Sequence, residues 1–296
     1  MSMTTENARE PRTLPFRHAR FDAPLGAEIV GLDLTRPLDD ATFASVRRAF
    51  LDSGGVLVLR DQRITPEQHI AFSRRFGPLA IHVLRQFLLP GHPEILLVSN
   101  VIENGKPVGL GDAGRYWHSD LSYLPEPSLG SLLHAQEIPS EGGDTSFVNM
   151  YAAYEALSLD VRRQIAGKRA IHSYRKTYDK IEGSTFRPAL SAEQKAEVQE
   201  VAHPVVRTHP ETGRKALFVS EGFTTRILDL PEDESAALLQ YLFAHATSGA
   251  FSYRHRWQEH DIVFWDNRCV IHFAHGCPPH LRRHMHRTTV KGDVPR

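Results

Sequence analysis

The sequence Arg115-Tyr116-Trp117-His118-Ser119-Asp120-Leu121 contains half of a predicted metal site. Successive side chains of an extended strand point to opposite faces, so His118 and Asp120 are expected on the same side. An imidazole nitrogen beside a carboxylate oxygen suits a borderline divalent cation such as iron(II), which needs a third ligand to complete one face. Because a His-x-Asp pair is also common on a solvated strand edge, the metal interpretation depends on a partner elsewhere in the chain.

That partner lies near the C-terminal end of the chain. The segment 261–272 ends at His272, and Arg283 and Arg287 follow shortly after it. A second histidine on a late strand, followed shortly in the sequence by two arginines, is typical of a 2-His-1-carboxylate facial triad beside an anion-binding wall. Surface salt bridges are the ordinary role of such arginines, but two on one strand face after the distal histidine favour carboxylate recognition.

Strand alternation sorts the other C-terminal histidines. Arg283, Met285 and Arg287 are predicted to share one face of a strand, with His284 and His286 on the opposite face. We therefore expect a surface role for His284 and His286, and the same for His275 and His280. The segments 261–265 and 269–273 are predicted strands on either side of a hairpin turn at residues 266–268.

Hydrophobic patterns elsewhere indicate many short strands with a few helices. Helices are predicted at 39–51, from Thr65-Pro66 to about Gly77 with Gln68 closing a capping box, at 151–165 and at 231–245. Strands are predicted at 55–59, 94–98 and 131–138, with a strand pair at 205–208 and 216–219. Residues 172–200 are expected to run over the surface or near the mouth of the site. This order favours a mainly β fold with flanking helices (α+β), built around a jelly roll.

Composition limits the classes of partner. Apolar residues make up 41% and charged residues 24% of the 296 residues, enough for a substantial core. Lys+Arg and Asp+Glu are both 35, so the chain has no basic excess for nucleic acid or an anionic membrane. Any anion recognition must therefore be local.

The ends and the cysteines indicate the compartment and the domain organisation. There is no signal-peptide pattern at the N-terminus and no run of 18 apolar residues, and Cys269 and Cys277 do not form a disulfide framework. We expect a cytoplasmic protein with a flexible leader at residues 1–20 and a single domain at residues 21–296.

Taken together, these motifs resemble the TauD/TfdA family of iron(II)- and 2-oxoglutarate-dependent dioxygenases, most closely the taurine dioxygenase branch. The resemblance covers nearly everything from about Phe21 to Pro295, in the family's order. The segments that carry it are residues 24–29, 33–38, 64–66, 75–77, 115–121, 142–145, 208–214, 265–268, 285–287 and 292–293. The resemblance implies a double-stranded β-helix of the cupin-like jelly-roll type, and a dimer or tetramer.

The resemblance also implies a metal centre and a reaction. His118, Asp120 and His272 would hold Fe(II), and dioxygen (O2) with 2-oxoglutarate would hydroxylate a C–H bond and leave succinate and carbon dioxide. Related halogenases lack the carboxylate, so Asp120 favours hydroxylation. A sulfonate, alkyl sulfate or aryloxy acid would fragment after hydroxylation.

The remaining site residues are assigned by the same resemblance. Thr145 and Arg283 would bind the distal carboxylate of 2-oxoglutarate, and His82 and Arg287 would meet the anionic group of a small organic substrate. The loop 105–114 is a candidate lid. It ends in Ala113-Gly114, where taurine dioxygenase carries polar side chains, so the substrate is not assumed to be taurine.

Two other functions use the same residues. A zinc hydrolase could hold its metal with the same three ligands and an activated water, but it leaves Thr145 and Arg283 without a role. A non-catalytic jelly roll could bind a small anion as a sensor or carrier. Oxygen-dependent succinate release separates the dioxygenase from both.

Overall fold

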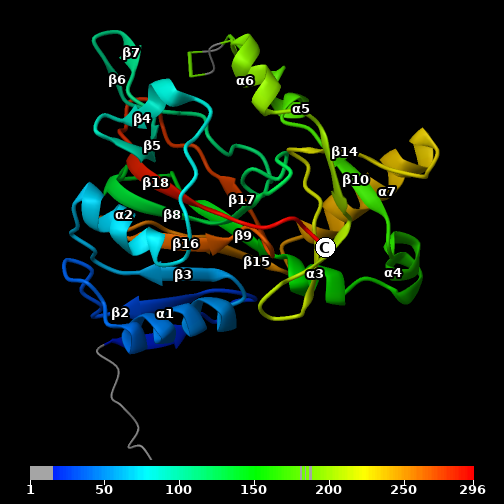
Figure 1. Ribbon diagram of the computed structural model, residues 1–296, viewed down its shortest axis with the longest axis horizontal. Coiled ribbons are helices and arrows are strands. Elements are labelled where there is room, and N and C mark those ends of the chain that lie inside the picture. The colour runs from blue at the N-terminus through cyan, green and yellow to red at the C-terminus, as the bar shows by residue number, and fades with distance from the viewer. Residues whose placement is uncertain (1–15, 181, 184, 187–188) are drawn as a thin grey trace, which may run out of the picture.

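The computed structural model describes residues 16–180, 182–183, 185–186 and 189–296. Two facing β-sheets form its centre (Figure 1). The larger sheet has eight strands in the spatial order β1 (Arg17–Arg20), β2 (Ala27–Val30), β3 (Val56–Leu59), β16 (Ile262–Asp266), β8 (Ser128–Glu137), β18 (His284–Lys291), β5 (His92–Ser99) and β4 (Leu88–Leu89). The smaller sheet consists of β15 (Ser252–His255), β9 (Thr145–Asn149) and β17 (Val270–Ala274).

Alternating side chains of the central strands face two different cores. In β16, Val263 and Trp265 face the smaller sheet, whereas Ile262 and Phe264 face the N-terminal helices. Phe264 stacks on Phe50 with ring centroids 3.8 Å apart. A fully buried aromatic side chain of this kind stabilises the fold by about 1.5–3 kcal/mol, so these contacts hold the helices onto the sheet.

The two helices on the outer face start where the sequence indicates. Helix α1 (Asp40–Asp52) is capped by Asp39, whose side chain accepts a hydrogen bond from the backbone N–H of Thr42. Helix α2 (Pro66–Arg74) begins with the predicted capping box between Thr65 and Gln68. Both caps satisfy amide groups that have no partner within the helix.

The remaining elements surround the sheets. Near α7 (Glu232–Ala246), Figure 1 shows β10 (Arg169–His172) and β14 (Thr224–Ile227), which form a three-stranded sheet with β11 (Val201–Pro204). The predicted strand pair is present as β12 (Val206–Thr208) and β13 (Lys215–Leu217). The other short elements are β6 (Ile102–Glu103), β7 (Lys106–Pro107), η1 (Arg85–Phe87), α3 (Met150–Glu155), α4 (Leu159–Ile165), α5 (Arg175–Tyr178) and α6 (Ala192–Glu197).

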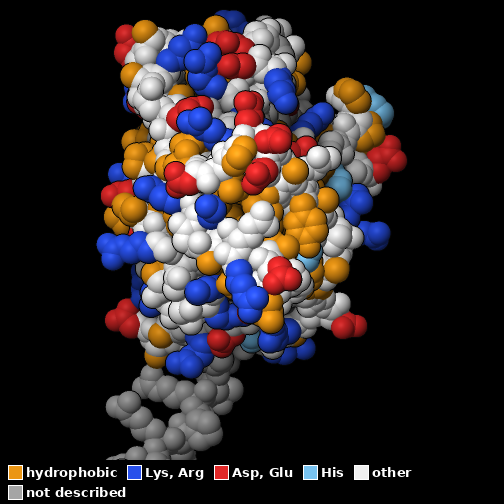
Figure 2. Space-filling view, turned by 90° about the vertical axis from the view of Figure 1, so that its right-hand side faces the viewer, with side chains coloured by type: hydrophobic (Ala, Val, Ile, Leu, Met, Phe, Trp, Pro, Cys, Tyr) orange, Lys and Arg blue, Asp and Glu red, His pale blue; other side chains and the backbone are white. Residues whose placement is uncertain are grey.

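The fold class is confirmed: the chain is mainly β with flanking helices and a jelly-roll core. The barrel is not closed, because β1 and β4 are edge strands of the larger sheet within the described residues. None of the helices described is long and apolar enough to cross a lipid bilayer. On the face drawn in Figure 2, basic and acidic side chains are intermingled.

Two predictions about helices and hairpins are wrong. The helix predicted at 151–165 is two helices, α3 and α4, because the Ser158 hydroxyl caps a new start by accepting from the N–H of Val161. β16 and β17 do not form a hairpin, since β16 pairs with β3 and β8 while β17 pairs with β9. The link between them crosses from one sheet to the other.

The predicted leader is also too long at its C-terminal end. Residues 1–15 lie outside the described part of the chain, but Arg17–Arg20 form β1, which pairs antiparallel with β2. All four side chains of β1 are exposed. Backbone pairing rather than burial places this segment, and composition does not reveal it.

Candidate metal centre

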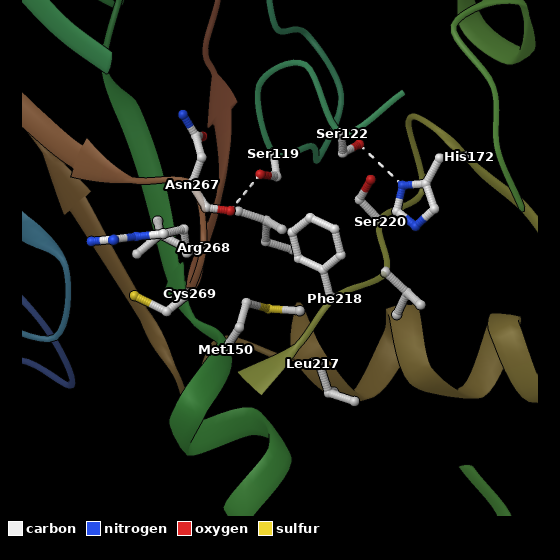
Figure 3. Close-up of a pocket in the computed structure, with 13 residues that line it drawn as sticks. Ser119, Ser122, Met150, His172, Leu217, Phe218, Ser220, Asn267, Arg268 and Cys269 are labelled. Carbon is white, nitrogen blue, oxygen red and sulfur yellow. Dashed lines mark hydrogen bonds between the residues drawn. The ribbon is translucent and has the colours of Figure 1, made fainter. Parts of the chain in front are cut away.

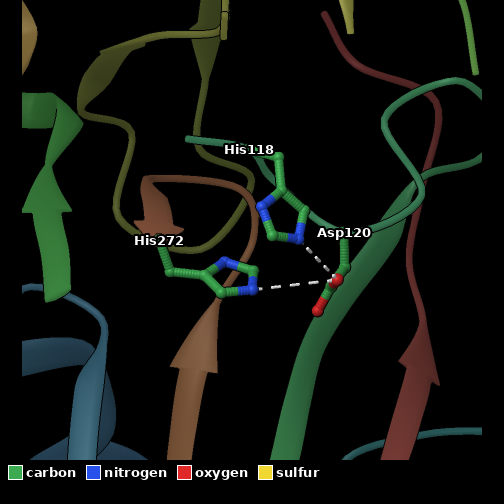
Figure 4. A group of neighbouring side chains, drawn as sticks. All are labelled: His118, Asp120 and His272. Carbon is green, nitrogen blue, oxygen red and sulfur yellow. Dashed lines mark ion pairs between the residues drawn. The ribbon is translucent and has the colours of Figure 1, made fainter. Parts of the chain in front are cut away.

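The three predicted metal ligands converge between the two sheets (Figure 4). One ligand atom from each of His118, Asp120 and His272 lies within 4.8 Å of the others. The Asp120 Oδ1 atom is 3.4 Å from Nε2 of His118 and 3.9 Å from Nε2 of His272. Two backbone hydrogen bonds, of 3.1 and 2.8 Å, join His118 to His272 and add this segment to the edge of the smaller sheet.

The local conformation of the 115–121 stretch differs from the predicted strand. Only His118 is in a β-bridge, and a turn begins at Asp120 and continues through Leu121, whose φ is 58°. The turn is held from both sides, since Ser128 Oγ donates to the Asp120 carbonyl and the Asp120 N–H donates to Asn267 Oδ1. Tertiary hydrogen bonds therefore keep the two ligands together where strand alternation does not.

The Asp120 carboxylate is buried and ionised. Burial raises its pKa, but the Arg287 guanidinium and the neighbouring imidazoles outweigh this effect and hold the pKa well below its usual range. Arg287 lies 3.2 Å from Oδ1, and the Ser131 hydroxyl donates to Oδ2 at 2.7 Å. Oδ1 is therefore the oxygen that faces both histidines.

The Nε2 atoms of both histidines lie on the side of this oxygen. His118 Nδ1 lies 2.8 Å from the Tyr116 carbonyl, which can only accept, so Nδ1 carries a proton and Nε2 is the nitrogen available to a metal. Burial, followed by the nearby His118, lowers the pKa of His272 well below its usual range and keeps its ring neutral. Two imidazole nitrogens and one carboxylate oxygen fit a divalent cation. This donor set is that of the iron(II) facial triad.

A cavity beside the triad contains the two residues predicted to bind 2-oxoglutarate. Thr145 at the start of β9 and Arg283 just before β18 line a cavity of about 30 Å³ together with His118 and His272. Burial lowers the pKa of Arg283 to about 10, so its guanidinium remains charged at neutral pH. Its Nε atom is buried without a hydrogen-bond partner. An anion in this cavity would satisfy that donor.

His82 and Arg287 line a second cavity, which shares Gly114 and His118 with the first. Arg287 also borders the first cavity together with Arg283. This is the arrangement expected for two arginines that are predicted to share one face of a strand. The structure adds one contact that strand alternation does not predict, the ion pair of Arg287 with Asp120. Arg287 thus links the second cavity to the metal centre.

The aromatic residues that line this second cavity are not among the site residues predicted from the sequence. Its ring contacts include Tyr116 with Phe223 at 5.6 Å and Tyr123 with Phe223 at 5.0 Å. Tyr174 also lines it, which places the start of the 172–200 segment near the site as predicted. Tyr123 and Phe223 are a hundred residues apart, and no sequence signal connects them. Aromatic rings on the wall of a cavity beside a candidate metal site offer contact area for an apolar part of a substrate.

The packing at the edge of both cavities explains why position 114 is a glycine. Its φ is 72°, and a Cβ atom there would lie 2.9 Å from Cε1 of His118. A side chain at this position would displace the His118 imidazole, a candidate metal ligand. The missing polar group at position 114 is therefore imposed by close packing against His118.

Next to the turn that carries Asp120 lies a small space of about 10 Å³, room for about one water molecule (Figure 3). Ser119 Oγ donates to the Asn267 carbonyl at 2.7 Å, and the Ser122 hydroxyl meets Nδ1 of His172 at 3.1 Å. Burial lowers the pKa of His172 to about 3, so the ring is neutral. These bonds hold the turn from the side opposite the metal.

One of the histidines expected at the surface is buried. His286 is 9% exposed and pairs across the sheet with His134 in β8, so its surface prediction is wrong. The alternation itself is correct, but the other face of β18 is covered by α2. His275 is half-buried against Ser146, and His280 is exposed as predicted.

The sequence matches the model of the taurine catabolism dioxygenase TauD, TfdA family over residues 15–289. The chain belongs to this family. It is 38% identical to pentalenolactone F synthase of Streptomyces arenae over 92% of this chain and 94% of that protein. It is 36% identical to the alpha-ketoglutarate-dependent 2,4-dichlorophenoxyacetate dioxygenase of Cupriavidus pinatubonensis, covering 90% of this chain and 95% of that protein.

A solved structure of AAD-2 in complex with Mn(II) and N-oxalylglycine superposes with a TM-score of 0.78 at 33% identity, covering 95% of this chain and 98% of that chain. The TauD/TfdA chain described here is accordingly a 2-oxoglutarate-dependent dioxygenase. Family membership favours this activity over a zinc hydrolase or a non-catalytic anion carrier.

Proposed function

We propose that this chain is an Fe(II)- and 2-oxoglutarate-dependent dioxygenase that hydroxylates a small organic anion, such as an aryloxy acid. One observation carries the proposal. The cluster of His118, Asp120 and His272 lies between a cavity with an unsatisfied arginine and a cavity lined by aromatic rings.

The metal would be held by Nε2 of both histidines and Oδ1 of Asp120. Iron(II) bound there, together with 2-oxoglutarate and dioxygen, supplies the oxidising power for an unactivated C–H bond. The chain's own contribution is to fix these ligands. Tyr116 sets the tautomer of His118, and Ser131 holds the far oxygen of the carboxylate so that Oδ1 remains directed at the metal.

Thr145 and Arg283 would hold the distal carboxylate of 2-oxoglutarate. The guanidinium offers charged donors and the hydroxyl offers one more, and both residues border the cavity that His118 and His272 also line. This arrangement orients the cosubstrate with its keto-acid end toward the metal.

The substrate would occupy the aromatic cavity, with its anionic group near His82 and Arg287. Tyr116, Tyr123 and Phe223 surround the space in which the rest of the molecule lies. Such a lining favours an aryloxy acid over taurine, whose amine finds no polar side chain at Gly114. Hydroxylation of the carbon next to the ether oxygen of an aryloxy acid yields a hemiacetal that releases a phenol. Alkyl sulfates and sulfonates would fragment by the same logic.

The compartment and assembly expected from the sequence, a cytoplasmic dimer or tetramer, remain part of this proposal. The described Cys269 and Cys277 are both free thiols, which suits a reducing compartment.

Two measurements test the proposed activity. Anaerobic addition of Fe(II) and 2-oxoglutarate should produce a weak visible charge-transfer band, which a zinc hydrolase cannot give. Aerobic assays over aryloxy acids, alkyl sulfates and sulfonates should then show substrate-dependent succinate with matching phenol, aldehyde or sulfite. We expect the highest kcat/KM for an aryloxy acid. Absence of the band and of coupled succinate would refute the activity, and a preference for taurine would refute the substrate class.

A further inference from the structure

Trp257 touches both residues of the 2-oxoglutarate clamp. Its indole Nε1–H donates to Thr145 Oγ1 at 3.1 Å, and the Arg283 guanidinium carbon lies 5.8 Å from the centroid of its ring. In the described part of the chain, Trp257 is the side chain that both donates to Oγ1 of Thr145 and lies against the guanidinium of Arg283. Neither contact follows from any sequence motif.

The fold brings Trp257 to this position. Strand β15 runs antiparallel to β9 with His255 opposite Thr145, so the chain that leaves β15 passes the start of β9. The His255 ring meets the Trp257 ring edge-on at 4.8 Å. Asp261 holds the next turn by accepting from the N–H of Gln258 and from Arg60. The indole is therefore held by groups that lie outside the cosubstrate cavity.

The hydrogen bond decides what the Thr145 hydroxyl can do. A hydroxyl has one proton to donate and two lone pairs. Because the indole N–H can only donate, it occupies a lone pair of Oγ1 and leaves the Thr145 proton free to donate to a carboxylate. The ring face near Arg283 adds a cation–π contact within the usual distance of about 6 Å. One side chain thus orients both anion-binding groups.

We infer that Trp257 is a positioning residue for the cosubstrate: it presets the Thr145 hydroxyl as a donor and supports the Arg283 guanidinium against its ring. This inference rests on the proposed binding of 2-oxoglutarate between Thr145 and Arg283. It predicts that changes at Trp257 act on cosubstrate affinity and leave the chemical step nearly unchanged.

The test measures binding without turnover. Wild type and variants are titrated with N-oxalylglycine in the presence of Mn(II) by calorimetry, and the KM for 2-oxoglutarate and kcat are measured separately. Trp257→Phe removes the N–H but keeps a ring, and we expect the Kd and KM to rise about 3–10-fold with kcat within about twofold. Trp257→Leu removes the ring as well and should raise both further.

Three further proteins make the result decisive. Tyr253→Phe removes a hydroxyl from β15, the strand that leads to Trp257. This hydroxyl meets Nδ1 of His255, and its removal should leave the Kd unchanged. In a Thr145→Val background, Trp257→Phe should add little to the loss already caused by Thr145→Val. Should Trp257→Phe fail to fold in a melting experiment, Trp257→His, which keeps a ring N–H, provides the comparison with Trp257→Leu.

The outcomes separate this inference from the proposed function. If wild type binds N-oxalylglycine and Trp257→Phe binds it equally well, or if the effects in the Thr145→Val background are additive, the role of Trp257 is refuted and the activity stands. The same holds if Trp257→His is no better than Trp257→Leu. If wild type does not bind N-oxalylglycine with Mn(II), the proposed function itself fails.

Discussion

Two buried clusters among the residues that the structure describes have ligand atoms close enough for a metal, and they differ in how their carboxylates are neutralised. Each has three members whose ligand atoms lie within 4.8 Å of one another: His118, Asp120 and His272 in one, and His209, Asp266 and Cys269 in the other. Distance alone does not distinguish them. The partners of each carboxylate do.

Asp266 has no oxygen left for a cation. Arg268 donates to both of its oxygens, at 2.8 and 2.7 Å, and His209 Nε2 lies 3.0 Å from Oδ2. Burial raises the pKa of Asp266, but Arg268 outweighs it and holds the pKa well below its usual range. Burial also raises the pKa of the Cys269 thiol well above its usual range, so the thiol is protonated and a poor ligand. This cluster is an internal ion pair.

Asp120 is neutralised by a single guanidinium at a longer distance. Arg287 reaches Oδ1 at 3.2 Å with one nitrogen, and the Nε2 atoms of His118 and His272 lie 3.4 and 3.9 Å from the same oxygen. A bidentate arginine two residues away closes one cluster, and a monodentate arginine from a distant strand leaves the other open. The comparison teaches that the partners of the carboxylate, rather than proximity, distinguish the candidate metal site from the internal ion pair.

The largest expected effect is on activity at the open cluster. Asp120→Ala removes the only carboxylate ligand, and substrate-dependent succinate formation should fall by more than about 100-fold, beyond the loss typical of outer-shell partners. Succinate release and bound Mn(II) per chain are the measurements. Asp160→Ala removes an exposed carboxylate on α4 and is the control. Full activity in Asp120→Ala would refute the ligand assignment.

At the closed cluster the expected effect is on stability. Asp266→Ala leaves Arg268 and His209 buried without their partner, and the free energy of unfolding should fall by about 3–5 kcal/mol. Urea unfolding with and without the substitution measures this. Bound Mn(II) per folded chain should not change. Loss of the metal with unaltered stability would reverse the roles of the two clusters.

Lowering the pH should reduce the free energy of unfolding through three buried histidines, while Asp266 stays ionised. Burial lowers the pKa of His134, His203 and His286 to about 4 each. The unfolded chain binds protons at these residues below about pH 6.5 and the folded chain does not. Their contribution to stability is therefore complete above pH 6.5 and is lost as the pH falls toward 4, at most about 1.4 kcal/mol per pH unit for each residue.

Urea unfolding at pH 7.5, 6.5 and 5.5 measures this loss. His134→Gln should flatten the decline, since that site no longer titrates. His280→Gln changes an exposed ring and should not. Equal slopes in His134→Gln and wild type would show that His134 is not among the responsible groups.

The smallest expected effect is at the thiol of the closed cluster. Cys269→Ser should leave the metal stoichiometry unchanged, because Cys269 does not bind the ion. In a Co(II) titration of wild type we expect no thiolate-to-cobalt charge-transfer band. A band that disappears in Cys269→Ser would show that the His209 cluster also binds metal.

Local patterns in the sequence predicted the elements whose reasons are local. The capping box at Thr65 and Gln68 and the buried strand 56–59 are examples, because a cap or an apolar run depends on neighbours in the chain. The break at Ser158 does not follow from the sequence pattern, because a serine within a helical pattern is only a weak signal for the start of a new helix. The buried position of His286 depends on α2, which no periodicity within β18 reveals.

The sequence by itself determined the family, the jelly-roll class and the residues that could form the site, since these depend on residue identity and order. Only the tertiary structure decided which His and Asp cluster is open, which rings line the second cavity, and that Trp257 meets both Thr145 and Arg283. The reason is physical. Whether a lone pair is free, a ring is enclosed or a donor is oriented depends on contacts between strands far apart in the chain, and spacing along one strand does not contain them.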